Sequence, residues 1–241
     1  MPVLEATDLI AGYGSGDTVL HGVSLTLGAG QVTALTGVNG AGKTTLASAV
    51  AGRVIPSSGK VTFQGADITK MPVQERCRLG IVLCPQGREV FPSLSAAENV
   101  RMGALTRPAS ARKAAVEDVF ELIPALAAFR NSRAGSLSGG QQQIVAIGRA
   151  LAAAPQVLIV DEPSMGLAPA IVDSVYEILG ALTENGVSLL VIEESPLRLV
   201  DLADHVVVMR GGEIVMSGGA EMLQDERVLT AALLGEEAMA E

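Results

Sequence analysis

Short apolar runs alternate along this chain with longer segments whose apolar positions recur at helical spacing. Continuous apolar runs are typical of strands covered on both faces, and they occur at Val32–Leu35, Ile81–Cys84, Val157–Val160, Leu189–Ile192 and Val206–Met209. Residues 169–183 gather apolar side chains on one helical face, namely Ile171, Val172, Val175, Ile178, Leu179 and Leu182. The alternation predicts an α/β structure with a largely parallel central sheet.

Two regions depart from this alternation. The last strand leads through "RGGE" into Ile214–Met216, which predicts an antiparallel hairpin at the sheet edge, because paired glycines suit tight turns. Between residues 87 and 154 strand patterns are missing, and "ASARKAAVEDVFELI" and "QQQIVAIGRALAAA" predict helices, the second beginning at Gln141. We therefore expect one domain, residues 1–241, with an α/β core from 1–86 and 155–241 and an inserted helical subdomain at 87–154.

Composition and charge narrow the class of protein. The chain has 17 basic and 26 acidic residues, and its net charge of −9 argues against a nucleic-acid partner, whose binding surface would cluster Lys and Arg. No window reaches the roughly 20 apolar residues of a membrane span, and the first residues lack the pattern of a secretory signal. Cys77 and Cys84 have no His nearby, so we expect thiols rather than a metal site. These features predict an intracellular protein.

A phosphate-binding motif follows the first predicted buried strand. The stretch "GVNGAGKTT" fits G-x-x-x-x-G-K-[ST] and lies between a strand and a helical pattern; its residues are Gly37, Val38, Asn39, Gly40, Ala41, Gly42, Lys43, Thr44 and Thr45. Glycines let successive backbone N–H groups converge on phosphate oxygens, and the following helix directs its positive end at the same anion. Lys43 adds a cation at the β- and γ-phosphates, and the Thr44 hydroxyl can ligate Mg²⁺. The alternative is a glycine-rich turn with a chance lysine.

A pair of carboxylates ends a second strand, in "QVLIVDEP". Asp161 lies at the strand tip, where it can hold Mg²⁺. Glu162 follows and can accept the proton of an attacking water. An Asp-Glu pair after an apolar strand is by itself a common loop start, but together with the phosphate loop it indicates nucleotide hydrolysis.

The stretch "LSGGQ" forms a second anion cradle at a helix start, from Ser138, Gly139, Gly140 and Gln141. One nucleotide does not need two such cradles on one chain. We therefore expect this cradle to act on the nucleotide of another subunit, with ATP held between two chains. The alternative is an ordinary capped helix with a flexible lead.

With these three motifs in this order, the chain resembles the nucleotide-binding subunit of ABC transporters over nearly all its length. The resemblance implies a phosphate-loop NTPase core with a mostly parallel sheet, an antiparallel edge and an inserted helical subdomain, and it implies ATP and Mg²⁺ as ligands. It also implies that Tyr13, in "AGYGSG", stacks on adenine. Gln86, in "LCPQGRE", would then sense Mg²⁺ and the attacking water, so that Thr44, Asp161 and Gln86 surround the metal.

The resemblance extends to partners and location. "PQGREVFPSLSAAENV", "DEPSMGLAP" and the tail "LLGEE" resemble the ATPases of importers for branched-chain amino acids and for amides or urea. Such importers pair two different ATPases with two integral membrane permease subunits. We therefore expect a second ATPase subunit, a permease helix in the groove beside the helical subdomain, and a peripheral position on the cytoplasmic face of the cell membrane.

Two positions depart from the family pattern. In "SMGLAP", Ala168 replaces an aspartate that often contacts the opposite subunit. In "LLVIEESPLR", Glu194 takes the place of a switch histidine that binds the γ-phosphate, and the two histidines, His21 and His205, lie elsewhere. A glutamate there favours an alternative, a hydrolysis-impaired regulatory subunit of an asymmetric heterodimer.

A third alternative is a soluble, non-transport ABC ATPase of DNA repair or chromosome structure. Such a protein needs a long coiled-coil insertion between the two halves of its site, and the about 90 residues between Gly42 and Ser138 are too few for one.

Overall fold

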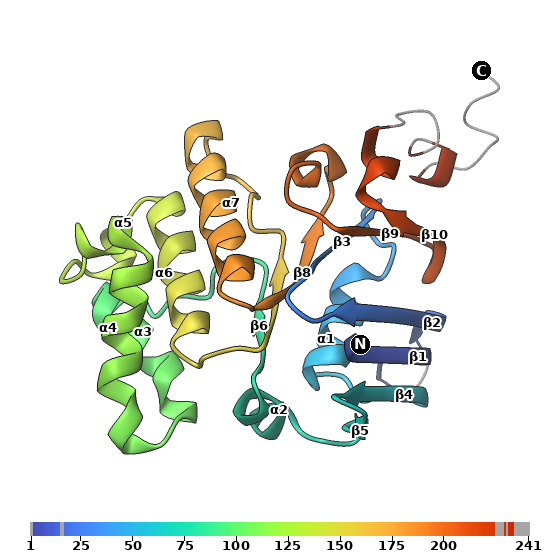
Figure 1. Ribbon diagram of the computed structural model, residues 1–241, viewed down its shortest axis with the longest axis horizontal. Helices are drawn as coiled ribbons and strands as arrows, with labels where there is room; N and C mark the ends of the chain where they lie inside the picture. Colours follow the sequence, from blue (N-terminus) through green and yellow to red (C-terminus); the bar gives the residue numbers. More distant parts are fainter. Residues whose placement is uncertain (1, 15–16, 225–228, 230, 234–241) are drawn as a thin grey trace.

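Two β-sheets and a group of helices build the fold, as Figure 1 shows for the computed structural model, which describes residues 2–14, 17–224, 229 and 231–233. The larger sheet has the strand order β10-β9-β3-β8-β7-β6. Its strands are β3 Val32–Gly37, β6 Ile81–Cys84, β7 Val157–Asp161, β8 Ser188–Glu193, β9 His205–Arg210 and β10 Glu213–Gly219. Neighbours from β6 to β9 pair in parallel, and β10 pairs antiparallel to β9. The predicted parallel sheet with its antiparallel edge is confirmed.

The central strands are apolar throughout because they serve two cores. On β8, Leu189 and Val191 pack with the helices α6 and α7, whereas Leu190 and Ile192 pack with α1 and the smaller sheet. Every residue of β3, β7 and β8 is buried. A strand in this position cannot alternate apolar and polar residues, which is why the continuous runs predicted it correctly.

The smaller sheet is antiparallel, with the order β2-β1-β4-β5. Its strands are β1 Pro2–Tyr13, β2 Asp17–Gly28, β4 Ser58–Phe63 and β5 Ala66–Asp67. The hydrophobic pattern predicted none of them individually. The register between β1 and β2 shifts several times, for example between Ala6 and Leu9, and each shift interrupts the alternation that identifies a half-buried strand.

Four α-helices lie between β6 and β7, and no strand occurs in residues 85–156, all of which the structure describes. They are α3 Ala96–Gly103, α4 Arg112–Leu122, α5 Pro124–Ala127 and α6 Gly139–Leu151. Elsewhere the described residues include the α-helices α1 Lys43–Ala51, α2 Val73–Leu79 and α7 Pro169–Glu184. Figure 1 places α3 to α6 together at one end of the molecule, away from the smaller sheet.

Two predicted helix starts were wrong by a few residues. α6 begins at Gly139 rather than Gln141, because Ser138 caps the helix: its Oγ accepts from the Gln141 amide, and Gln141 Oε1 accepts from the Ser138 amide. Such a reciprocal pair satisfies two amides that the first helical turn leaves free. α4 begins at Arg112, after a 3₁₀ turn over Ala109–Ala111.

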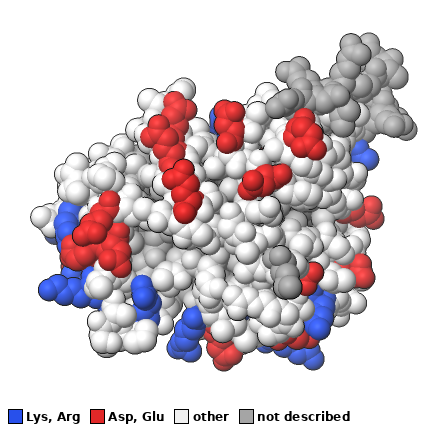
Figure 2. Space-filling view, in the orientation of Figure 1, with Lys and Arg blue, Asp and Glu red and all other residues white. Residues whose placement is uncertain are grey.

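Within the described ranges, no helix is long and apolar enough to cross a membrane. Figure 2 shows Asp and Glu side chains along α7 and Lys and Arg side chains mainly at the lower edge of the visible face. On α7 the exposed carboxylates belong to Asp173, Glu177 and Glu184.

Candidate functional site

The loop between β3 and α1 depends on its glycines. A Cβ atom on Gly37 would lie 2.3 Å from the carbonyl oxygen of Met209 on the neighbouring strand β9. Gly42, which precedes the first residue of α1, has a φ of 102°, a conformation that side-chain-bearing residues rarely adopt. The backbone therefore curls tightly over the start of α1, whose positive end favours an anion at this place.

Lys43 lies inside this curl. Its side chain is buried, and its Nζ donates to the carbonyl oxygens of Gly37 at 2.7 Å and Val38 at 3.2 Å. A cavity of about 270 Å³ opens beside the lysine, lined by Val19, Asn39–Thr45, Gln86 and Glu162. The structure thus brings three residues of other segments, Val19, Gln86 and Glu162, to the phosphate loop.

Asp161 ends β7 next to the loop. Asp161 is 2% exposed, and its Oδ1 has no hydrogen-bond partner. Among the described residues, this is true of no other buried side-chain oxygen or nitrogen. Burial raises the pKa of Asp161, and a hydrogen bond with the Thr44 side chain partly opposes this. An unpaired buried carboxylate oxygen beside a threonine hydroxyl is a donor set that fits Mg²⁺, a hard cation that prefers oxygen ligands.

Glu162 turns sharply away from the strand. Its φ is 48°, and its amide donates to the Ile192 carbonyl of β8 at 2.9 Å. Its Oε2 accepts from Gln86 Nε2 at 2.6 Å, and the same amide nitrogen lies 3.1 Å from the sulfur of Met165. The strained turn directs the carboxylate towards the cavity, where a carboxylate can accept a proton from water.

Glu194 also reaches the phosphate loop. Its exposed side chain accepts through Oε1 from Asn39 Nδ2 at 3.1 Å, and its carbonyl oxygen lies 3.4 Å from Thr36 Oγ1. The structure therefore places this residue beside the loop, and its part in the nucleotide site stays a prediction. His205 lies elsewhere: its Nε2 is 2.8 Å from Ser217 Oγ on β10.

The preceding residue, Glu193, was given no role by the sequence. It is 3% exposed, and its Oε1 accepts from the Tyr176 hydroxyl at 2.7 Å and from the Ser164 amide at 3.0 Å. Arg198 Nη1 contacts Ser164 Oγ. The signal was present in "LLVIEESPLR", since the first glutamate directly follows the apolar run of a buried strand, but its partners lie 29 and 17 residues away.

Tyr13 lies at the end of β1 with half of its side chain exposed. Its hydroxyl is 3.4 Å from Thr45 Oγ1 of the phosphate loop. The ring is thus available beside the loop, and stacking on adenine stays a prediction. Residues 15 and 16 of "AGYGSG", like residues 234–237 of "LLGEE", lie outside the described residues.

The second cradle is not brought to the phosphate loop of its own chain. Ser138–Gln141 begin α6, and none of them lines the cavity beside Lys43. A Cβ atom on Gly140 would lie 2.3 Å from the Cγ2 of Ile171, so the second glycine allows α6 to approach α7. The predicted action on another subunit's nucleotide stays a prediction.

A larger cavity, of about 520 Å³, lies where α2 and β6 meet α3 and α6. Phe91 and Met102 are exposed at its wall, and the half-buried Arg149 donates to the carbonyl oxygens of Arg88 and Glu89. Both thiols line it, and burial raises the pKa of Cys84 to about 12. The family resemblance implied a groove beside the helical subdomain but did not identify its residues.

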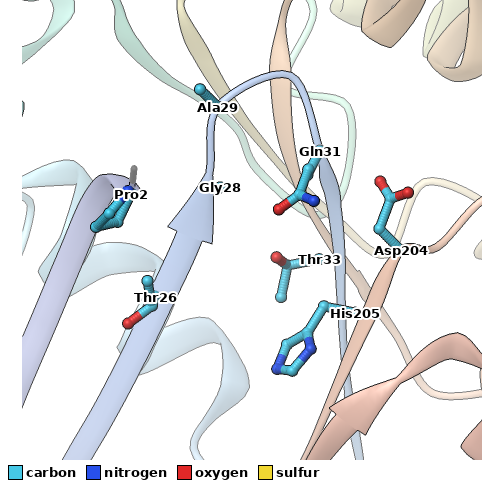
Figure 3. A pocket seen from close by; sticks show the side chains of 8 residues that line it. All are labelled: Pro2, Thr26, Gly28, Ala29, Gln31, Thr33, Asp204 and His205. Atoms are coloured by element: carbon cyan, nitrogen blue, oxygen red, sulfur yellow. The ribbon is translucent and has the colours of Figure 1, made fainter.

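A third cavity, of about 500 Å³, lies at the opposite end of β3 from the phosphate loop (Figure 3). Gln31, Thr33 and His205 line it, and Asp204 accepts from the Val32 amide at 2.8 Å. It shares no residue with the cavity beside Lys43.

Comparison with known proteins gives a consistent result. The family model described as ABC transporter matches residues 20–165. The chain is 37% identical over 95% of its length to the high-affinity branched-chain amino acid transport ATP-binding protein BraG of Pseudomonas aeruginosa, 98% of which is covered. It is 31% identical to the probable branched-chain amino acid transport ATP-binding protein LivF of Archaeoglobus fulgidus, with 93% of this chain and 96% of that protein covered.

Other relatives serve a different transport process. The lipopolysaccharide export system ATP-binding protein LptB of Acidithiobacillus ferridurans is 31% identical, with 98% of each chain covered. Among solved structures, a nucleotide-free ATP-binding cassette from an ABC transporter superimposes with a TM-score of 0.83 at 29% identity, covering 95% of this chain and 98% of that one. A cassette in its ADP conformation also gives 0.83, at 28% identity over the full length of both.

Proposed function

Because the chain belongs to the ABC transporter family of ATP-binding proteins, we propose that it hydrolyses Mg-ATP to drive an importer of branched-chain amino acids or related small amides. The observation that carries the hydrolytic part is the group around the phosphate loop: the Asp161 carboxylate with its unpaired Oδ1, and Glu162 with its Oε2 2.6 Å from Gln86 Nε2. Transporter ATPase activity is a property of the family; the metal, the cargo and the residue roles are our proposals.

The residues divide the chemistry between them. Lys43 and the loop amides hold the phosphates, while Thr44, Asp161 and Gln86 hold Mg²⁺. The metal, when bound, neutralises charge that develops on the phosphate oxygens. Glu162 accepts the proton of the attacking water, and Gln86 keeps that carboxylate aimed at the cavity. Two chains face each other, and Ser138–Gln141 of one complete the site of the other.

The cargo is proposed from the relatives' names, BraG and LivF, which denote branched-chain amino acid transport. LptB, at 31% identity, shows that the fold also serves export. The decisive test is reconstitution of the chain with its own permease and partner ATPase in vesicles. We expect ATP-dependent uptake of leucine, lost with Lys43→Ala in this chain. Uptake of urea in preference to leucine would move the assignment to amides, and no uptake of either would reject the import proposal.

The permease helix is assigned to the cavity where α2 and β6 meet α3 and α6. Exposed Phe91 and Met102 supply apolar contact, and Arg149 and Glu89 supply polar groups at its wall. We expect Phe91→Asp to release the chain from membranes containing the permease without changing its affinity for ATP. Continued membrane attachment would show that the permease binds another surface of the chain. The peripheral position on the cytoplasmic face would then not depend on this cavity.

A second candidate function rests on Glu194. An ionised glutamate can only accept hydrogen bonds, so it cannot donate to a γ-phosphate as a histidine can. The chain would then be the slow or regulatory member of a heterodimer whose other subunit carries turnover. Low ATPase activity of this chain alone, rising on addition of a histidine-bearing partner, would support that role.

A further inference from the structure

The turn that carries Glu162 is held from outside by side chains that do not touch the cavity beside Lys43. Its first anchor is backbone: the Glu162 amide donates to Ile192 of β8. The second anchor is a side chain, because Glu193 Oε1, the next residue on β8, accepts from the Ser164 amide at 3.0 Å. Both hydrogen-bond acceptors belong to β8, so the turn is attached to that strand at two successive residues.

Tyr176 completes the second anchor. Its hydroxyl donates to the same Glu193 oxygen at 2.7 Å from the second turn of α7. Burial raises the pKa of Tyr176, and the neighbouring Glu193 carboxylate raises it further, so the hydroxyl keeps its proton at neutral pH. With two donors on one oxygen, the carboxylate is confined to a single orientation.

The anchored residue, Ser164, follows the proposed base, Glu162, by only two positions. Ser164 is itself buried, and the Met165 amide donates back to the Glu162 carbonyl at 3.2 Å. Met165 also lies against Gln86, the partner of the Glu162 carboxylate. A shift of Ser164 therefore moves Met165 and Gln86 together with Glu162.

We propose that Tyr176 and Glu193 are positioning residues for ATP hydrolysis, which hold Ser164 and through it the turn that aims Glu162. The inference rests on the proposed function, in which Glu162 is the base. Because neither residue lines the nucleotide cavity, the effect falls on the chemical step and not on ATP binding. Small misplacements of a reacting group are costly: about 1 Å can lower a rate about 100-fold.

The test uses the full-length chain, alone and in its assembled transporter, with Tyr176→Phe as the main variant. This change removes one hydroxyl and keeps the ring, so folding is preserved. We expect kcat to fall about threefold to tenfold, while KM and the calorimetric Kd for Mg-ATP stay unchanged. The matched control is Ser174→Ala, which removes a hydroxyl on the same helix that bonds only to Ala170 within α7; its kcat should equal that of wild type.

A second pair of variants separates positioning from packing. Glu193→Gln keeps an oxygen that can accept from Ser164 and Tyr176, and should retain more of kcat than Glu193→Ala. The double variant Glu193→Gln, Tyr176→Phe should lower kcat by a smaller factor than the product of the two single factors, because both changes act on one contact.

Two results would overturn the proposal: a kcat in Tyr176→Phe equal to that of wild type and Ser174→Ala, or a parallel rise of KM and Kd. Fully multiplicative effects in the double variant would do the same. Glu162→Gln is assayed in parallel. If that variant hydrolyses ATP at the normal rate, the proposed function is wrong in its assignment of the base. That result is distinct from a failure of Tyr176 and Glu193 to affect kcat.

Discussion

Each of two neighbouring parallel strands, β7 and β8, ends at an adjacent pair of carboxylates, and the two pairs differ in their hydrogen-bond partners. In both, the first carboxylate is the buried last residue of the strand, and the second, which follows the strand, is more exposed. Buried Asp161 on β7 has an oxygen without a partner, whereas buried Glu193 on β8 accepts from two donors. A buried carboxylate oxygen without a partner in the protein indicates a ligand site, whereas one with its hydrogen bonds made within the protein indicates a structural role.

The outer carboxylates differ in the same way. Glu162 is bound by the Gln86 amide at 2.6 Å inside the cavity, and Glu194 is bound by Asn39 at 3.1 Å from the exposed side of the loop. Position at a strand end therefore does not define a catalytic group. The surrounding partners do, and substitutions at the four carboxylates test that distinction.

The largest expected effect separates the two outer residues. Glu162→Gln should lower ATP turnover about 100-fold or more, because an amide cannot accept the proton of water. Its affinity for Mg-ATP should be retained, and the variant should accumulate as an ATP-bound dimer in sizing experiments. Glu194→Gln, the matched change on β8, should leave turnover within about twofold. Equal losses in the two variants would remove the difference between the strand ends.

The inner residues should differ in their dependence on metal. Asp161→Asn should raise the Mg²⁺ concentration needed for half-maximal turnover by about tenfold or more, because one carboxylate ligand is lost. Glu193→Gln should leave that concentration unchanged, since its oxygen faces Ser164 and Tyr176. A magnesium titration of the ATPase rate gives both values, and a shifted midpoint in the β8 variant would contradict its structural role.

The inner residues should also differ in stability, with opposite signs. Glu193→Ala should cost about 1–3 kcal/mol, because it leaves the buried Ser164 amide without a partner. Burial raises the pKa of Asp161 in the folded state, so the fold binds that proton more tightly than the unfolded chain does. Stability is then lost as pH rises from the unfolded pKa through the folded pKa, and at pH 7 the bare carboxylate is unfavourable.

Asp161→Asn should therefore raise the melting temperature when Mg²⁺ is chelated with EDTA, while Glu193→Ala lowers it. Thermal unfolding of both variants at pH 7 provides the measurement. A lower melting temperature for Asp161→Asn under these conditions would show that the carboxylate is stabilised by a partner.

The smallest effect concerns the position where a histidine is expected. Two like charges about 4 Å apart repel by roughly 4 kcal/mol at an effective dielectric near 20, and Mg²⁺ offsets part of this. Glu194→His should raise the turnover of the isolated chain a few-fold, and Glu194→Ala should leave it unchanged or slightly higher. Steady-state rates decide the matter, and a strong loss in Glu194→Ala would make this glutamate a working catalytic group.

The sequence by itself determined the phosphate loop and the buried strands. A loop such as "GVNGAGKTT" depends on where glycines permit unusual backbone angles, which is a local property. A strand covered on both faces needs an apolar run, which is equally local. The antiparallel strands β1, β2 and β4 escaped prediction because shifts of register interrupt their alternation.

Only the tertiary structure decided what each carboxylate meets. Glu193 and Asp161 look alike in the sequence, because each follows an apolar run and precedes a second carboxylate. The difference arises from Tyr176 on α7 and Ser164 in the turn after β7, which reach Glu193, while Asp161 lies beside Thr44. Such contacts join segments that the strand order β3-β8-β7 brings together, and no local pattern records which side chains will meet there.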